Sequence, residues 1–328
     1  MYYRKRHGKG FTYQDETGNT IRDQKLRARF EELVIPPAWQ EVEIAENVSS
    51  KILVTGRDTK GRKQYIYHPK YIQKRQRAKY DRILRFAEQL ETMRRVTGQH
   101  LRHEEVTRGK VLACMVRLLD SAYFRPGSPR YTEENETYGL TTLRSRHLTI
   151  EEDELIFEYV GKSGKEQERH VEDRRLAKVI QELDDIPGYR IFKYFDESGD
   201  KQTVESHDLN EYIKEVMGED FSAKDFRTWA GTMIAAIALD ELGICEPEAQ
   251  EAMNKRIREA VNRVAEHLGN TPAVARNSYI DPRIIEHYMN GRTTRYFKQQ
   301  VKKMLKNKQN LSEEELSVLC LLRDSLND

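Results

Sequence analysis

Tyr279 stands in a stretch whose turn signals could place its hydroxyl group in a cleft. Thr271 followed by Pro272 is typical of a helix start, because threonine caps the first turn and proline fits the first helical position. Asp281 followed by Pro282 repeats the signal, so Tyr279 should lie at the end of a short helix, beside a break. A tyrosine that packs in a core with its hydroxyl group outward is the other interpretation of this stretch.

A side-chain amide lies nine residues before this tyrosine. Asn270 follows Gly269, and glycine commonly ends a helix, here one predicted over about 247–268. A polar residue at such a junction can point into a cleft instead of a core. Asn270 is therefore a candidate partner of Tyr279.

Three basic residues elsewhere in the chain stand in contexts that suit a binding site. Arg125 precedes a glycine-containing loop, and Lys162 lies in a tight turn over 161–165. Arg227 is predicted in the first turn of an apolar helix over 229–242, where the helix dipole disfavours a cation. Singly, each could be a surface charge or an ion-pair partner.

Together these five residues suit the attack of a tyrosine hydroxyl group on a phosphodiester. Two arginines can grip the non-bridging oxygens, an amide can donate a further hydrogen bond, and a lysine can protonate the leaving 5′-oxygen. Each positioned donor of this kind contributes on the order of 3–4 kcal/mol. The sequence has neither the HExxH or CxxC spacings of metal sites nor a GxxxxGK[ST] loop, so we expect no metal, nucleotide or other cofactor.

The first 75 residues are predicted to be mainly β-structure with one short helix. The helix is expected over 22–33, a hairpin over 11–15 and 18–21, and further strands over 38–44, 52–56 and 64–67. A basic turn over 57–63 leads into the last strand. Because basic and amide side chains contact phosphates and base edges, duplex DNA contacts are predicted for Arg62, Lys63, Gln64, Tyr65 and Tyr67. Ordinary sheet packing of these tyrosines is the alternative.

The remaining chain is predicted to be mainly helical around a small antiparallel sheet. Helices are expected over about 82–124, preceded by a basic stretch over 70–85, and again from 172 onward. The predicted strands are 139–143, 147–150, 155–160 and 168–171. The tail over 298–328 is predicted to hold a basic helix, with Lys302, Lys303, Lys306 and Lys308, and then an acidic one. We therefore predict an α+β protein with a β-rich domain over 1–76 and a mainly α-helical catalytic domain over 77–328.

Charge is distributed unevenly along a chain in which 34% of residues are charged and the mean hydropathy is −0.82. Residues 1–110 contain 25 Lys and Arg against 14 Asp and Glu, whereas the remainder contains 31 against 40. A basic first third suits a polyanion, with a solvated surface as the alternative. No apolar run reaches the ~20 residues of a membrane span, and no signal peptide is apparent. Three widely spaced cysteines, Cys114, Cys245 and Cys320, are expected to be buried free thiols.

Several ordered segments resemble the type IB DNA topoisomerases of the small poxvirus and bacterial kind. They are Arg125-x-Gly127 with Tyr131, the block from Glu134 to Leu143 with His147, Val160-Gly161-Lys162, Asp225-x-Arg227-Thr228, Gly269-Asn270-Thr271-Pro272 with Ser278-Tyr279, and Lys60 to Tyr67 in the first domain. The resemblance extends over about residues 1–290. The ordered set is specific although each fragment is weak, and the tail from about 297 has no counterpart.

The resemblance implies an isomerase that relaxes supercoiled double-stranded DNA without ATP or a required metal. Tyr279 would form a 3′-phosphotyrosyl link, and Lys162 would be the main general acid. Arg125 and Arg227, assisted by Asn270, would stabilise the transition state. Tyr131 would contact DNA. A monomer, a C-shaped clamp of two domains and, for a bacterial source, a cytoplasmic location at the nucleoid are also implied.

Two positions depart from the family pattern. The poxvirus enzymes have histidine where this chain has Asn270, which can still donate to a phosphate oxygen but cannot carry charge. We therefore expect activity with a weaker pH dependence from this position. The pattern would also place lysine at Ser128, which bears on DNA contacts.

Two other functions share these residues. A tyrosine recombinase or integrase uses much the same catalytic set, acts as a tetramer on two sites, and usually has a helical first domain. A non-catalytic DNA-binding protein could keep the fold alone. The sheet-rich first domain disfavours the former, and occupation of all five chemical positions disfavours the latter.

Overall fold

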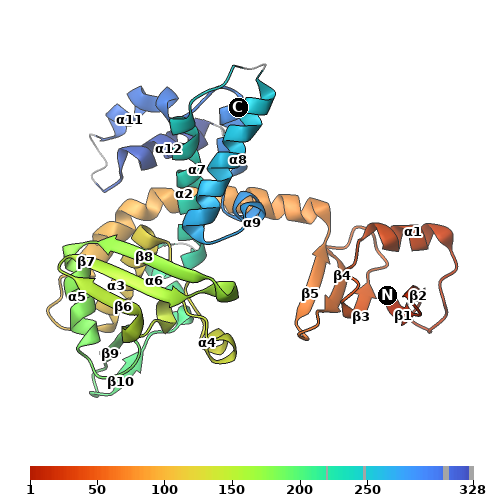
Figure 1. The fold of residues 1–328 in the computed structure, drawn as a ribbon, viewed down its shortest axis with the longest axis horizontal. Helices are drawn as coiled ribbons and strands as arrows, with labels where there is room; N and C mark the ends of the chain where they lie inside the picture. The colour runs from red at the N-terminus through yellow and green to blue at the C-terminus, as the bar shows by residue number, and fades with distance from the viewer. Residues whose placement is uncertain (219–220, 247–248, 306–309, 325–328) are drawn as a thin grey trace. The chain divides into compact units, whose positions relative to one another are not determined.

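The computed structural model describes residues 1–218, 221–246, 249–305 and 310–324. It divides into two compact units, Met1–Asp81 and Arg82–Asp328 (Figure 1). One long helix, α2 (Pro69–His100), contains both the unit boundary and the predicted boundary after residue 76. The predicted α+β class is confirmed, with a sheet-rich first unit and a mainly helical second one. The predicted C-shaped clamp stays a prediction.

The first unit is a five-stranded antiparallel sheet with one helix packed on it. The strand order is β2-β1-β3-β4-β5, with bounds β1 Tyr2–His7, β2 Gly10–Gln14, β3 Gln40–Ile44, β4 Ile52–Arg57 and β5 Lys63–Tyr67. The helix α1 (Gln24–Glu32) inserts Phe30 into a core that includes Tyr13, Val42 and Ile44. Strand β5 lies at the edge of the sheet, so its outer backbone groups and side chains are available to a partner.

The predicted hairpin over 11–15 and 18–21 is present in short form, but the main partner of β2 was missed. The antiparallel bridge between Gln14 and Thr20 is flanked by backbone hydrogen bonds from Asp15 to Asn19 at 3.0 Å and from Ile21 to Tyr13 at 2.8 Å. Over its whole length, strand β2 pairs with β1.

Strand β1 was not predicted from the sequence because the residue that points into the core, Arg4, is a cation. Arg4 is buried and donates hydrogen bonds to the carbonyl oxygens of Ile35, Pro36 and Trp39, each at 2.9 Å. A buried arginine bound to carbonyl groups breaks the apolar alternation from which strands are predicted.

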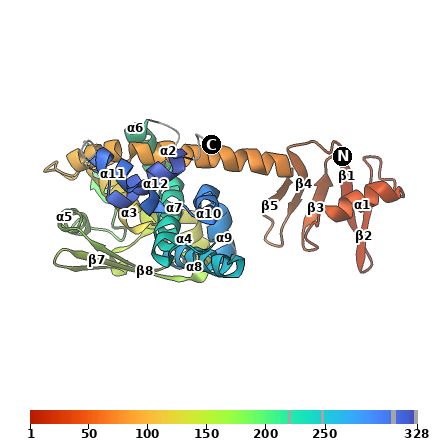
Figure 2. The same cartoon turned by 90° about the horizontal axis from the view of Figure 1, so that it is seen from above.

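The second unit is organised around buried helices. In α3 (Arg108–Ala122), which lies within the region predicted to be helical over about 82–124, ten of fifteen residues are buried. Figures 1 and 2 show α7 (Ala223–Leu242), α8 (Gln250–Leu268) and α9 (Pro272–Ser278) side by side. This unit also contains α5 (Arg174–Asp184), α6 (Ser206–Met217) and α10 (Pro282–Met289). The first residues of the predicted helix over 247–268, Pro247 and Glu248, lie outside the described residues.

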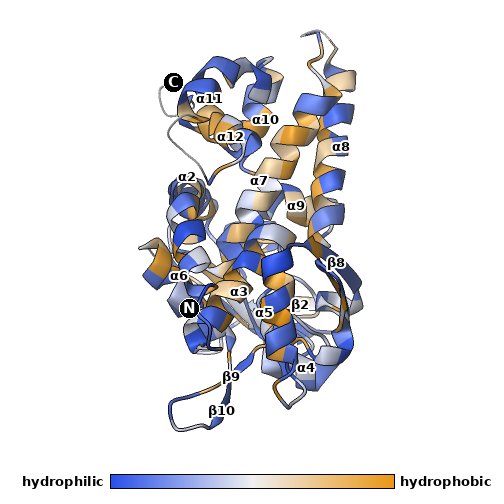
Figure 3. Ribbon diagram, turned by 90° about the vertical axis from the view of Figure 1, so that its left-hand side faces the viewer, coloured by the Kyte–Doolittle hydropathy of each residue, from blue (hydrophilic) through white to orange (hydrophobic). Residues whose placement is uncertain are grey.

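A three-stranded antiparallel sheet, in the order β6-β7-β8, completes this unit. Its strands are Leu148–Glu151, Glu154–Val160 and Glu166–Glu172, and β8 is largely hydrophilic in Figure 3. The predicted fourth strand over 139–143 was wrong, because Leu140–Thr142 forms a 3₁₀ turn. The hydroxyl group of Thr142 accepts a hydrogen bond from the backbone N–H of Gly139 at 3.0 Å, which closes the turn.

Two further elements, a hairpin and a short helix, were not predicted from the sequence. A hairpin of β9 (Lys193–Phe195) and β10 (Lys201–Thr203) interrupts the region expected to be helical from 172 onward. Its loop is folded by Asp196, whose carboxylate accepts hydrogen bonds from the backbone N–H groups of Ser198 and Asp200 at 3.0 Å each. The loop after Arg125 contains a short helix, α4 (Pro129–Asn135).

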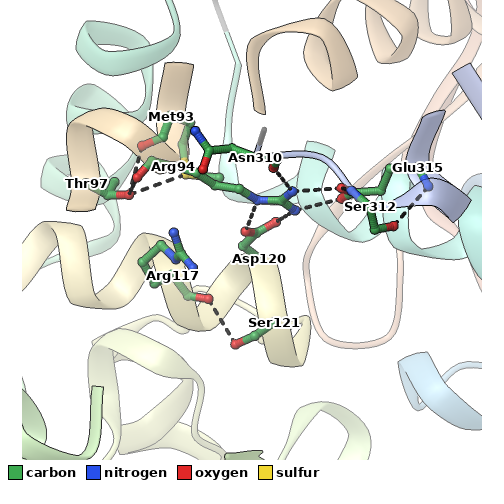
Figure 4. A network of polar contacts seen from close by, with 9 residues as sticks. All are labelled: Met93, Arg94, Thr97, Arg117, Asp120, Ser121, Asn310, Ser312 and Glu315. Atoms are coloured by element: carbon green, nitrogen blue, oxygen red, sulfur yellow. Dashed lines mark hydrogen bonds and ion pairs between the residues drawn. The ribbon is translucent and has the colours of Figure 1, made fainter. Parts of the chain in front are cut away.

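The tail packs against the helical unit through α11 (Lys298–Leu305) and α12 (Glu313–Asp324). Residues Glu315 to Leu322 are buried. Figure 4 shows Arg94 of α2 between two carboxylates: its guanidinium lies 2.8 Å from Asp120 of α3 and 2.7 Å from Glu315 of α12. The predicted basic and acidic halves fit these helices, although Lys306 and Lys308 lie outside the described residues.

The described residues contain neither a membrane-spanning helix nor a metal-binding cluster. No described helix combines the length and apolar character needed to cross a membrane. Within the same ranges, no cluster of three or more His, Cys, Asp or Glu residues could hold a metal ion. All three cysteines are free, and Cys114 and Cys320 are buried as expected, whereas Cys245 is partly exposed.

Candidate active site

Arg227 is buried on α7 in the second unit, with only 2% of its surface exposed. Helix α7 begins at Ala223, earlier than predicted, so Arg227 stands in the second turn and not the first. Its guanidinium donates to the carbonyl oxygen of Tyr123, which follows α3, and to that of Leu268, the last residue of α8, the latter at 2.7 Å. It therefore meets the negative ends of two helix dipoles. Burial, and then the nearby Arg125, lower the pKa of Arg227 to about 10, so it stays charged at neutral pH.

Arg125, in the loop after α3, also binds the C-terminal end of α8. Its Nη2 donates to the side-chain oxygen of Asn270 at 2.6 Å and to the carbonyl oxygen of Gly269 at 3.3 Å. The 3₁₀ turn holds the loop, because the backbone N–H of Leu140 donates to the carbonyl oxygen of Arg125 at 2.8 Å. Gly139 permits this approach, since a Cβ there would lie 2.6 Å from Cα of Gly127. The segment predicted as a strand thus positions Arg125.

Asn270 is fixed by the end of α8. Gly269 adopts a left-handed conformation with φ of 61°, and the backbone N–H of Asn270 donates to the carbonyl oxygen of Ala265 at 2.8 Å, as in a Schellman motif. Because its side-chain oxygen accepts from Arg125, its Nδ2 faces the other way. That Nδ2 is buried and has no hydrogen-bond partner among the described residues.

Tyr279 lies at the end of α9, where the predicted helix signals place it. Thr271 caps α9 and Asp281 caps α10, each with a proline behind it, as predicted. The ring of Tyr279 packs on Arg227, whose Cζ lies 5.3 Å from the ring centroid. The tyrosine is partly exposed, so its hydroxyl group can meet a ligand that the arginine also meets.

Unpartnered buried donors mark the centre of the site. Among the described residues, only five buried side-chain polar atoms lack a hydrogen-bond partner, and three of them are Nε of Arg227, Nδ2 of Asn270 and Nε of Arg169. Arg169 belongs to β8 and contributes to the lowered pKa of Arg227 and, after burial, of Arg125. Buried donors are normally satisfied, so this group suits an anion that accepts several hydrogen bonds.

Lys162 is the one predicted catalytic residue that is not joined to the others. It is exposed in the turn between β7 and β8, and no contact with the other four predicted catalytic residues is found in the part of the chain described. The turn itself is well defined, since the backbone N–H of Gly161 donates to the carbonyl oxygen of Lys165 at 2.7 Å. The structure therefore brings Arg125, Arg227, Asn270 and Tyr279 together and leaves Lys162 in a turn of the neighbouring sheet.

The predicted DNA-contacting residues of the first unit divide between two faces of β5. Alternation along a strand places Lys63, Tyr65 and Tyr67 on one face and Gln64 on the other. Tyr65 is 41% exposed, and its ring stacks on that of Tyr67 with centroids 5.8 Å apart. Gln64 instead donates to the carboxylate of Asp58 at 3.0 Å, and Arg62 donates to the same carboxylate at 2.8 Å.

Tyr131, the sixth predicted DNA contact, belongs to the second unit. It lies on α4 and is 56% exposed. The roles of all these residues in DNA binding stay predictions.

Comparison with known proteins identifies the family. A model of the catalytic core of eukaryotic DNA topoisomerase I matches residues 68–309, and a model of the N-terminal domain of bacterial DNA topoisomerase IB matches residues 10–58. DNA topoisomerase 1B of Acanthamoeba polyphaga mimivirus is 30% identical over 294 residues, 88% of each chain. DNA topoisomerase 1B of vaccinia virus (strain Copenhagen) is 26% identical over 245 residues, 74% of each chain.

This chain belongs to the type IB DNA topoisomerase family. It is therefore an isomerase of the family that relaxes DNA, and this membership disfavours the recombinase and the non-catalytic protein. The predicted bacterial source and cytoplasmic location stay predictions, because the similar proteins reported above are viral. The catalytic-core match ends at residue 309, before α12 begins.

Sequence reasoning missed three residues that shape the candidate site. Arg169 and Gln167 on β8 carry no motif, and only the structure brings them to Asn270 and Arg125. Gly231 could have been noticed, because a glycine within a helix is costly unless another group approaches closely. A Cβ at Gly231 would lie 2.7 Å from the carbonyl oxygen of Tyr279.

Proposed function

We propose that this type IB topoisomerase relaxes supercoiled duplex DNA by attack of the Tyr279 hydroxyl group on a backbone phosphodiester. The bond from phosphorus to the 5′-oxygen breaks, leaving a 3′-phosphotyrosyl link and a free 5′-hydroxyl group. The nicked strand then rotates about the intact one, and the 5′-hydroxyl group attacks the link to restore the DNA and release Tyr279. The bond energy is retained in the link, so ATP is not required.

The main support is the set of unpartnered donors beside Tyr279. Arg227 and Asn270 each direct a buried N–H group that lacks a partner among the described residues, and Arg125 is bound to Asn270. The pentacoordinate phosphorus gains negative charge on its non-bridging oxygens, and preorganised donors stabilise such charge. We propose Arg125, Arg227 and Asn270 for this task, which these side chains can perform without a metal.

Lys162 is proposed as the general acid that protonates the leaving 5′-oxygen. An ammonium group in an exposed turn can reach a DNA strand that lies across the site, although it does not touch the other catalytic residues here. In the first unit, we propose that Lys63, Tyr65 and Tyr67 face the duplex. We also propose that the enzyme acts as a monomer in the cytoplasm, needing one tyrosine per cleavage.

The decisive experiment is relaxation of a negatively supercoiled plasmid in EDTA without ATP. Wild type should relax the plasmid and Tyr279→Phe should not, whereas Tyr296→Phe, at a tyrosine that is 63% exposed, should behave as wild type. With duplex labelled at the 5′ end of the cut strand, the label should become attached to wild-type protein. Relaxation by Tyr279→Phe, or attachment of a 3′ label instead, would refute the mechanism.

A further inference from the structure

Gln167 is wedged between the two segments that carry Lys162 and Asn270. A Cβ at Gly161, just before Lys162, would lie 2.8 Å from Cγ of Gln167. A Cβ at Gly269, just before Asn270, would lie 2.8 Å from its side-chain oxygen. Real Cβ atoms essentially never lie under 3.0 Å from such atoms, so only glycine fits at both places without a shift.

The Gln167 side chain is held in this position from its own strand. Its oxygen accepts a hydrogen bond from Nη2 of Arg169 at 3.0 Å, and its Nε2 donates to the carbonyl oxygen of Glu166 at 2.8 Å. Its backbone pairs with Tyr159 across the β7–β8 ladder. A side chain with both ends of its amide bonded can act as a fixed spacer.

On the other side of Gly269 lies the anion site. Arg125 donates to the carbonyl oxygen of Gly269 and to the side chain of Asn270. Contacts therefore run from the Lys162 turn through Gln167 to Gly269 and then to Arg125. No described contact joins Lys162 itself to the other predicted catalytic residues, so its distance from the phosphate depends on how the turn is placed.

We propose that Gln167 is a positioning residue that sets the Lys162 turn against the Asn270 loop and so aligns the general acid with the scissile phosphate. The inference rests on the proposed function, because it assumes that Lys162 protonates the leaving oxygen. It assigns to Gln167 no contact with DNA. Its effect is on the protonation step alone.

Changing the leaving atom separates a role in protonation from a merely structural role, because only a defect in protonation depends on whether oxygen or sulfur leaves. In the proposed step the Tyr279 hydroxyl group loses its proton to solvent as its oxygen bonds to phosphorus. The bond to O5′ breaks, and O5′ takes a proton from Lys162, which regains one from solvent. When sulfur replaces O5′, the leaving thiolate is stable without a proton, so a general acid contributes little. General-acid catalysis contributes about 10²–10⁴-fold, and a 1 Å misplacement costs about 10²-fold.

The experiment measures single-turnover cleavage of duplexes with oxygen or sulfur at the bridging 5′ position. Gln167→Ala should cleave the oxygen substrate on the order of 10-fold or more slowly and the sulfur substrate at close to the wild-type rate. Gln167→Met, which refills the space but lacks the two hydrogen bonds of the amide, should recover part of the loss, and Gln202→Ala on β10 should resemble wild type. Equal loss on both substrates, or no loss, would overturn the proposal.

Lys162→Ala, tested on the same two substrates, separates this inference from the proposed function. Its rescue by sulfur supports the general-acid role, whereas equal loss on both substrates refutes that role and with it the alignment step. The contact is then tested by Gly161→Ala alone and with Gln167→Ala. Gly161 has φ of −93°, which alanine adopts, so the single change acts only through its clash with Gln167. The double variant should be less impaired than the product of the two losses, and simple multiplication would refute the contact.

Discussion

Gly231 on α7 sets how closely Tyr279, the proposed nucleophile, approaches the helix that carries Arg227. A Cβ at this position would lie 2.7 Å from the carbonyl oxygen of Tyr279 and 2.9 Å from its Cβ. The neighbouring Thr232 holds the same segment, because its hydroxyl group lies 3.3 Å from the Tyr279 carbonyl oxygen and accepts from the backbone N–H of Asp281 at 3.1 Å. We therefore predict that Gly231→Ala displaces Tyr279.

The size of the displacement follows from these distances. Ordinary van der Waals contact begins at 3.4 Å, so the Tyr279 carbonyl oxygen must move by about 0.7 Å, or α7 must bend by as much. Misplacement of reacting groups by 1 Å costs about 10²-fold in rate, so cleavage should slow by roughly 10- to 100-fold. Overpacking costs about 1–3 kcal/mol, offset by about 1 kcal/mol because alanine favours a helix over glycine. Net destabilisation should be about 0–2 kcal/mol.

The assay is single-turnover formation of the covalent complex on a labelled duplex, with unfolding and DNA affinity measured on the same samples. Gly98→Ala is the matched control, because this glycine of α2 has nothing within 4 Å of an added Cβ. The control should be no less stable than wild type and cleave equally fast. A Gly231→Ala enzyme that cleaves at the wild-type rate would refute the reasoning. So would a slow enzyme whose DNA affinity has fallen in proportion.

Two further predictions concern stability. Arg94→Ala leaves the carboxylates of Asp120 and Glu315, which are mostly buried, without their shared partner, so it should cost about 3–5 kcal/mol in urea unfolding. The exposed neighbour Arg95→Ala should cost little, and equal losses would contradict the argument. Burial, and then the adjacent arginines, lower the pKa of His147 in the folded protein from 6.5 to about 4. As the pH falls, His147 is therefore protonated in the unfolded chain before it is protonated in the folded one, and this favours unfolding. Between pH 7.5 and 5.5 wild type should lose about 1.3 kcal/mol relative to His147→Gln, and parallel pH profiles would contradict this.

The helix ends around Tyr279 could be predicted from sequence because capping is local. Thr271, Asp281 and Gly269 act within a few residues of themselves, and each behaves as its residue type predicts. The strand predicted over 139–143 was wrong because the contacts that decide its conformation are not local. Its residues suit a strand, and only the close approach of Gly139 to Gly127 and the bond to Arg125 favour a turn.

The environment of Arg227 could not be predicted for a similar reason. Its two carbonyl partners, on Tyr123 and Leu268, are 104 and 41 residues away along the chain. Arg227 was selected because a cation in the first turn of a helix is disfavoured by the helix dipole. This argument does not hold, because α7 starts at Ala223 and Arg227 lies in its second turn. The relevant dipoles are those of α3 and α8, at whose ends the guanidinium lies.

This arrangement explains how a largely buried pair of arginines can stay available for the phosphate that we propose they bind. A carboxylate beside Arg125 or Arg227 would stabilise the cation but would also neutralise it and compete with the ligand. In the ranges that the structure describes, neither arginine pairs with a carboxylate. Both are held by oxygens at the ends of helices, from Tyr123, Leu268, Gly269 and Asn270. Carbonyl groups offset part of the desolvation penalty and leave the arginines positively charged, as the proposed stabilisation of negative charge on phosphorus requires.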